Sequence, residues 1–458
     1  MRDKIREALK RSKADYTEVR LEERESTRIA YRGKELETAS AVIDKGGIVR
    51  CLCRKNGWGV ATFNNLDDLL NKVEQAYHCA LVAQSDESIE LVSIPVTEDH
   101  LTVTLQRDFR GLSMAEKKAL IEAYNDILLG YSDKIIDTQA IYGDSFSRVT
   151  FANSEGAYIE EERPSVAAVC VAIARDGDNI QQAYETRAGP CGFEFVQGLE
   201  ELAKKAARTA VDLLSAKSVV GGQYPVVIDS MLAGVFIHEA FGHLSESDFV
   251  YENPKAREMM VLGRRFGKDI LNVFDDGSIP GLRGTHKYDD EGTPTRRNDL
   301  IKDGILVGRL HSRETAAKMG EQPTGNARSI NYRHPPIVRM TNTAIEAGTT
   351  SFENMIKDIK LGIYACDAYG GQTALESFSF SSGYAYMIRD GQIAEMVKDV
   401  ILAGNLFITL MNIDAIGNDF KWIYTSGGCG KGNQNPLPVA FGAPHIRIQN
   451  VVIGGQSA

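Results

Sequence analysis

Residues 236–243, with the sequence FIHEAFGH, constrain the local fold more than any other part of this chain. His238 and His243 flank Glu239 in the pattern H-E-x-x-x-H. On a regular α-helix, residues five apart lie about 140° apart around the axis, so two imidazoles at this spacing do not converge. A π-helical turn, which adds one residue, would bring them to one side. Alternatively, the helix ends at Gly242, whose freedom in φ redirects His243. We expect one of these two distortions.

The residue types in this segment are those of a hydrolytic metal site. Histidine is the commonest protein ligand for metals such as zinc, and a glutamate beside the metal can accept a proton from water. The spacing is one residue longer than the H-E-x-x-H of familiar zinc proteases. The motif therefore favours metal-assisted hydrolysis. The alternative is two hydrogen-bonded histidines near an apolar helix, with no metal.

A catalytic zinc takes three protein ligands and leaves one position open, so a third ligand is needed. Cys429 stands out because glycines surround it in Gly427-Gly-Cys-Gly-Lys-Gly. We expect the backbone to hold this cysteine and to leave its sulfur accessible, and metal binding deprotonates such a thiol. The alternatives are a tight turn with an incidental cysteine, and a phosphate-binding loop, for which the P-loop spacing is absent. The other candidate ligands are Glu246, Asp248, His286, His311, His334, His445 and the remaining cysteines.

Composition narrows the class of protein. A chain of 458 residues is long enough for two or more domains. Its net charge is −10 and it has no dense Lys/Arg run, which argues against direct binding to nucleic acid or anionic lipid. We expect no membrane segment, because no apolar run approaches about 20 residues and the charged start lacks a signal-peptide core. Seven dispersed cysteines predict reduced thiols and a cytoplasmic location.

Apolar and polar residues alternate over 17–62 and again over 134–190, which predicts antiparallel strands with one solvated face. A helix is expected from Asn64 to about residue 83, and a second one after a capping box formed by Ser113 and Glu116. A long helix over 196–215 closes this half. Cys51 and Cys53 lie on one face of a predicted strand, and we interpret them as structural.

The second half is predicted to be richer in strands. Residues 219–223 read as a linker, and a short buried strand over 225–229 leads into the motif helix. Asp303-Gly304 and Asp390-Gly391 lie between apolar runs and predict hairpins. The expected fold class is α+β with two domains. Residues 1–218 form a mixed α/β domain with antiparallel strands, and residues 219–458 form a mostly antiparallel β domain that holds the motif helix.

Several motifs together resemble one known family. His238-Glu239-x-x-x-His243-x-x-Glu246-x-Asp248 is similar to the signature of the TldD/PmbA metallopeptidases, on the TldD side; PmbA-type partners lack the H-E-x-x-x-H. The resemblance spans essentially the whole chain. Its further segments are Gly46-Gly-Ile-Val-Arg, Gly57-Trp-Gly-Val-Ala-Thr, Ile279-Pro-Gly-Leu-Arg-Gly, Asp289-Asp-Glu-Gly-Thr-Pro-Thr, Pro323-Thr-Gly-Asn, Arg339-Met-Thr-Asn-Thr, Gly370-Gly-Gln and Gly428-Cys-Gly-Lys.

The resemblance implies a role for each matching residue. His238, His243 and Cys429 would bind one Zn²⁺ per catalytic chain, and Glu239 would be the catalytic glutamate. Glu246 and Asp248 would orient the ligands or donors around the metal. The alternative for these two acids is a surface position at a helix end. His334 lies in a similar segment without an assigned role, and His286 and His445 remain structural.

The function that follows is zinc-dependent hydrolysis of unfolded or short peptides, with Glu239 accepting the proton of water. The family implies an enclosed site in a homodimer, or in a heterodimer with a PmbA-type subunit. Two alternatives stay open. One is a zinc hydrolase of small amides. The other is a non-enzymatic regulatory protein, for example a modulator of DNA gyrase, for which the acidic charge argues against direct DNA contact but not against a protein partner.

Overall fold

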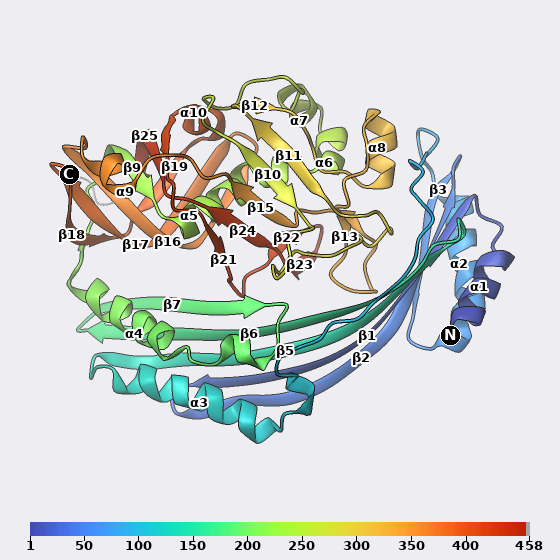
Figure 1. Ribbon diagram of the computed structural model, residues 1–458, viewed down its shortest axis with the longest axis horizontal. Coiled ribbons are helices and arrows are strands. Elements are labelled where there is room, and N and C mark those ends of the chain that lie inside the picture. The colour runs from blue at the N-terminus through green and yellow to red at the C-terminus, as the bar shows by residue number, and fades with distance from the viewer. Residues whose placement is uncertain (455–458) are drawn as a thin grey trace.

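The alternating segments of the first 190 residues form one long, curved sheet in the computed structural model, which describes residues 1–454 (Figure 1). The strand order is β3-β2-β1-β5-β6-β4, and β7 also pairs with β6. All pairs are antiparallel except β4 with β6. The strands are β1 Tyr16–Arg32, β2 Glu35–Cys53, β3 Gly57–Phe63, β4 Glu98–Leu101, β5 Ile135–Asn153, β6 Tyr158–Asp176 and β7 Asn179–Gly189.

Four helices cover the outer, convex face of this sheet (Figure 1). They are α1 Arg2–Arg11, α2 Leu69–Val82, α3 Met114–Gly130 and α4 Glu200–Ser215. The predicted capping box is confirmed, since the Ser113 side chain accepts from the Glu116 N–H and the Glu116 carboxylate accepts from the Ser113 N–H. The helix expected after Asn64 is also present, with a 3₁₀ turn over Leu66–Asp68 before α2.

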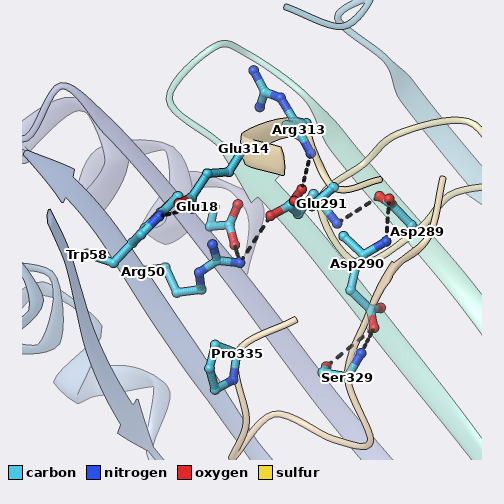
Figure 2. Close-up of polar contacts among 12 residues, drawn as sticks. Glu18, Arg50, Trp58, Asp289, Asp290, Glu291, Arg313, Glu314, Ser329 and Pro335 are labelled. Atoms are coloured by element: carbon cyan, nitrogen blue, oxygen red, sulfur yellow. Dashed lines mark hydrogen bonds and ion pairs between the residues drawn. The ribbon is translucent and has the colours of Figure 1, made fainter. Parts of the chain in front are cut away.

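The inner face of the sheet is polar, but the expectation that it would be solvated is wrong for much of its length. Glu18 and Arg50 are at most 5% exposed, because loops of the second half pack against them. Arg50 Nη1 lies 2.9 Å from Glu18 Oε1 and 3.5 Å from Glu291 Oε1 (Figure 2). Glu291 in turn accepts the backbone N–H of Arg313 at 3.0 Å. Ion pairs and hydrogen bonds thus replace water between the inner face of this sheet and the second half of the chain.

The second half contains two larger sheets and two small hairpins. The eight-stranded sheet has the order β16-β9-β25-β19-β17-β18-β8 with β20 beside β25, and the six-stranded sheet has the order β12-β11-β10-β15-β24-β21. The strands are β8 Lys217–Ser218, β9 Gly222–Ile228, β10 Val273–Asp276, β11 Arg297–Lys302, β12 Ile305–Leu306, β13 Ala327–Arg328, β14 Ile337–Val338, β15 Asn342–Ile345, β16 Leu361–Ala374, β17 Ser377–Arg389, β18 Gln392–Lys398, β19 Ile401–Asn405, β20 Ile413–Ile416, β21 Lys421–Ile423, β22 Cys429–Lys431, β23 Gln434–Leu437, β24 Ala440–Ala443 and β25 Ile446–Gly454.

Short helices connect these strands, and one of them lies at the centre of the second half. Helix α5 contacts β16 of the eight-stranded sheet and β15 and β24 of the six-stranded sheet. The others are α6 Ser247–Glu252, α7 Pro254–Met259, α8 Arg313–Met319, α9 Phe352–Ile356 and α10 Leu406–Met411, and α5 itself spans Ser230–Ile237. Among residues 1–454, no helix combines the length and the apolar character needed to cross a membrane.

Both predicted hairpins are confirmed. Asp303-Gly304 joins β11 to β12, and Asp390-Gly391 joins β17 to β18, with positive φ at all four residues as two-residue hairpin turns require. The linker expected over 219–223 is corrected. Strand β8 ends at Ser218 and β9 begins at Gly222, so only three residues connect two strands of the same sheet. The first of these three residues, Val219, is buried. The fold class is α+β, as expected.

Candidate metal centre

The motif helix begins at a well-defined cap and is apolar on all sides. The Asp229 side chain accepts the Leu232 N–H at 2.8 Å and so caps α5. Buried residues Leu232, Phe236 and Ile237 face the two surrounding sheets. Because packing holds α5 on every side, the residues that follow it have a fixed position in the core.

A π-helical turn follows α5 and carries the motif. It spans His238–Gly242, and the backbone N–H of His243 donates to the carbonyl of His238, five residues back. The two imidazole rings consequently lie on one side, with ring centroids 5.3 Å apart. The predicted distortion of the helix is therefore confirmed in its π form. A Cβ at Gly242 would lie 2.0 Å from the sulfur of Met340, so the turn packs closely against that side chain.

Three side chains converge at this turn. One ligand atom from each of His238, His243 and Cys429 lies within 4.8 Å of the others, and Cys429 Sγ is 3.3 Å from His243 Nε2. His238 Nδ1 is buried and has no hydrogen-bond partner among residues 1–454. An orphaned buried nitrogen is costly, so this geometry fits a bound ion. Two imidazoles and one thiolate form a donor set that suits zinc and leaves a fourth position open.

Cys429 reaches the histidines from β22, but the expectation that its sulfur is accessible is wrong. The residue is 2% exposed, because β22 pairs with β23 and the side chain belongs to the main core of the second half. Arg339 Nη2 donates to the Cys429 carbonyl at 2.6 Å and fixes the backbone there. Burial by itself would raise the pKa of the thiol, but His238 and His243 lower it to about 5. This lowered pKa favours the thiolate form of Cys429 at neutral pH.

Glu239 lies beside the three converging side chains. Its Oε2 is 3.8 Å from His243 Nε2, the ring nitrogen that faces Cys429. The Glu239 side chain keeps 30% of its surface exposed, whereas the neighbouring His238 is 4% exposed as a residue. The Glu239 side chain is therefore partly open to solvent.

Glu246 is placed to orient His243. Glu246 Oε2 lies 3.0 Å from His243 Nδ1, so the ring can donate there and keep its Nε2 lone pair for a metal. Burial would raise the pKa of Glu246, but Lys431 and His243 lower it to about 2, so it is a carboxylate. Asp248 contacts no histidine; its Oδ1 accepts from Lys431 Nζ at 2.6 Å. Glu246 is 1% exposed, so it is no surface acid.

Lys431 and Arg283 have structural roles here that the sequence analysis did not assign. Lys431 Nζ lies 3.0 Å from Glu246 and 2.6 Å from Asp248, and so joins both acids to the strand of Cys429. The signal was present, because Lys431 is two residues after Cys429 and residues two apart on a strand share a face. Arg283 donates to the carbonyls of Thr425 and Gly427, just before that strand. Arg283 lies in the segment Ile279-Pro-Gly-Leu-Arg-Gly, which carries part of the family resemblance but did not indicate this role.

The other histidines considered as ligands do not join this group. His311 hydrogen-bonds Ser247 and Glu321, and His445 bonds Tyr364 and Asp419. His286 Nε2 accepts from Arg328, and burial, aided by Arg163, lowers the pKa of His286 to about 4. His334 is half-buried in a turn after Asn331.

Comparisons with known proteins fit this arrangement. Family models of the PmbA/TldA metallopeptidases match residues 17–80 (domain 1), 107–214 (central domain) and 221–455 (C-terminal domain). A metalloprotease of Synechocystis sp. is 48% identical over 447 residues, which are 98% of this chain and 96% of the relative. This chain belongs to the PmbA/TldD metallopeptidase family.

Two further known proteins are similar to this chain. A zinc metalloprotease TldD homolog of Saccharolobus solfataricus is 27% identical over 430 residues, or 90% of each chain. The crystal structure of TldE from Thermococcus kodakarensis superposes with a TM-score of 0.77 at 20% identity, covering 99% of this chain and 100% of that one. At this identity the second similarity concerns the fold alone.

Proposed function

We propose that this member of the PmbA/TldD family is a zinc-dependent peptidase that hydrolyses unfolded or short peptides. The observation that carries the proposal is the convergence of His238, His243 and Cys429 on one point, with the Glu239 carboxylate beside it. The relatives support it, since those cited are metalloproteases and one is a zinc metalloprotease. One zinc ion per catalytic chain would occupy the point where the three side chains meet.

The proposed reaction uses the chain's own residues for ligation, orientation and proton transfer. When bound, zinc supplies Lewis-acid chemistry, polarising the scissile carbonyl and lowering the pKa of water toward about 7. Glu239 accepts a proton from the attacking water as the new C–O bond forms. Glu239 then gives this proton to the amide nitrogen as the C–N bond breaks, which releases an amine and a carboxylate.

The acids behind the ligands complete this proposal. Glu246 holds His243 Nδ1 and so fixes which nitrogen His243 presents. Asp248 acts one step further away, because it binds Lys431, which in turn holds Glu246. Both therefore orient the ligand set rather than touch the substrate.

Assembly, location and domain division are also proposals. We infer a homodimer or a heterodimer with a PmbA-type subunit from the family, and a reducing cytoplasm from seven cysteines that are all free. We propose two units, residues 1–218 and 219–458. The first sheet supports this division, because segments 17–80 and 107–214 both contribute strands to it. Strand β8, at Lys217–Ser218, lies at the end of the first unit and pairs with β18 of the second unit.

Mass-spectrometric detection of cleavage in a mixed pool of unstructured peptides tests the proposed activity. The zinc-loaded wild type is compared with Glu239→Gln, purified identically to control for a contaminating protease. We expect products from the wild type only. Turnover of small amides without peptide cleavage would favour the alternative hydrolase. Equal products from both proteins would contradict a peptidase activity that depends on Glu239.

A further inference from the structure

A cavity of about 420 Å³ lies between the inner face of the first sheet and the second half of the chain. Strands β1, β5 and β6 form one wall. The other wall includes residues 281–287, 328–330 and 436–438, the last of which end or follow β23, the partner of the Cys429 strand. The cavity is large enough to receive the end of a short peptide.

The lining of this cavity is positively charged, although the chain as a whole carries −10. Six basic and four acidic side chains line it: Arg20, Arg24, Arg163, Arg283, Lys287 and Arg328 against Glu22, Glu161, Glu162 and Asp290. Within residues 1–454, Arg24, Arg283 and Arg328 form no ion pair with any carboxylate, whereas the other three basic residues do. The cavity thus has more basic than acidic side chains in its lining, and three of the basic ones form no ion pair within residues 1–454, which favours an anionic ligand.

Arg283 is the group best placed to bind that anion. Two backbone carbonyls, of Thr425 and Gly427, hold its Nη1 and fix the guanidinium in place. Its Nε is buried without a hydrogen-bond partner in the described chain, and burial lowers the pKa of Arg283 to about 10. A partly buried cation without an acid partner is costly, and a guanidinium fork matches a carboxylate with two parallel hydrogen bonds.

The cavity adjoins the metal centre through one hairpin. Leu437 and Pro438 line the cavity, and Leu437 pairs with Cys429 across β22 and β23. Arg283 Nη1 donates a hydrogen bond to the carbonyl of Gly427, two residues before Cys429. A chain end held at Arg283 therefore lies next to the hairpin that supplies the proposed thiolate ligand.

We propose that Arg283 binds a carboxylate of the peptide substrate, namely the free carboxylate at its C-terminus, with Arg24 and Arg328 adding positive charge. This inference rests on the proposed peptidase function and specifies its substrate class: short peptides with a free C-terminus that reaches the cavity. An acidic side chain near the end of a peptide offers the same chemistry. A charge-assisted hydrogen bond of this kind changes affinity by about 10- to 100-fold.

The test compares three peptides of one sequence, with a free C-terminal acid, a C-terminal amide, and an amide with glutamate placed near the end. KM and kcat/KM are measured for the wild type, Arg283→Ala and Arg283→Lys, with zinc content determined for each. Arg389→Ala serves as the control, because Arg389 pairs with Glu395 on a distant, exposed hairpin. Binding of the acid and the amide to Glu239→Gln is measured in parallel by calorimetry.

We expect the wild type and Arg389→Ala to prefer the free acid by about 10- to 100-fold in kcat/KM, Arg283→Ala to lose this preference, and Arg283→Lys to keep part of it. A preference for the glutamate-containing amide equal to that for the acid would assign the site to side-chain carboxylates instead. Equal use of acid and amide by the wild type would overturn the inference. So would an Arg283→Ala variant that loses zinc and activity but keeps the acid-to-amide ratio, since Arg283 would then only position the loop.

The outcomes separate the two proposals. If the wild type cleaves peptides without discriminating acid from amide, the peptidase stands and the carboxylate site fails. If no peptide is cleaved, the peptidase fails, and calorimetry still decides whether Arg283 binds a carboxylate.

Discussion

The two histidines of the proposed metal centre differ in how their Nδ1 atoms are held. His243 Nδ1 is 3.0 Å from Glu246, whereas His238 Nδ1 has no partner among residues 1–454. Glu246 therefore orients His243 by its charge, whereas packing around the π-helical turn holds His238. Removing the Glu246 carboxylate should therefore loosen His243 without deleting it.

The sulfur of Cys429 is predicted to hold the ion. Cys429→Ser replaces a thiolate with a neutral hydroxyl, so bound zinc, measured by mass spectrometry of the purified protein, should fall sharply. Cys79→Ser, at an exposed position on α2, controls for the loss of a thiol elsewhere. Full zinc occupancy in Cys429→Ser would show that Cys429 is not a zinc ligand.

Glu246→Gln should weaken zinc binding by about 10- to 100-fold, since it removes the charge that orients His243. Competition with a chromogenic chelator measures this affinity. Asp248→Asn is the matched control and should have a smaller effect, because Asp248 contacts Lys431 and no histidine. An unchanged affinity in Glu246→Gln would show that packing alone orients His243.

Among the elements, the π-helical turn brings the two histidines of the motif to one side. Gly242→Ala should destabilise the protein by about 1–3 kcal/mol, because its Cβ would lie 2.0 Å from the buried sulfur of Met340. Chemical denaturation measures the loss, and Gly242→Ala should cost less stability when it is introduced into a Met340→Ala variant than when it is introduced into the wild type. Gly130→Ala is the control, since a Cβ there would meet nothing within 4 Å. Equal stability of Gly242→Ala and wild type would mean that Met340 moves aside freely.

A distorted helix could be predicted from the sequence because two imidazoles five residues apart do not converge on a regular α-helix. The choice between a π turn and a helix end at Gly242 could not be made from the sequence. Asp303-Gly304 marked its hairpin because both residues accept positive φ. The burial of Glu18 was missed, since alternation identifies the polar face of a strand but not what covers that face. The accessibility of Cys429 was misjudged for a similar reason, because glycines around a cysteine do not reveal the arginine and paired strand that enclose it.

At the scale of the whole molecule, the first sheet and the second half meet through buried charges (Figure 2). Burial raises the pKa of Glu18 from its ordinary value of 4.5 to about 7; Arg50 opposes this shift and Glu291 adds to it. Below about pH 4.5 Glu18 is protonated in both the folded and unfolded chain. Between about pH 4.5 and 7 the folded chain holds more protons, so the free energy of unfolding falls as pH rises.

Glu18→Gln removes this titration while leaving Arg50 its contact with Glu291. Between pH 5 and pH 8, the free energy of unfolding of the variant relative to wild type should rise by about 1–3 kcal/mol. Denaturation curves at several pH values measure it. Glu7→Gln, an exposed carboxylate on α1, controls for net charge. A difference that is constant with pH would contradict the raised pKa of Glu18.

The central claim is that His238, His243 and Cys429 bind one zinc ion. X-ray absorption at the zinc edge on the zinc-loaded protein tests it most directly, with metal content measured on the same sample. We expect one zinc per chain, with two nitrogen neighbours at about 2.0–2.1 Å and one sulfur at about 2.3 Å. The sulfur should disappear in Cys429→Ser. A zinc shell without sulfur in the wild type, or a chain that binds no zinc, would contradict the account.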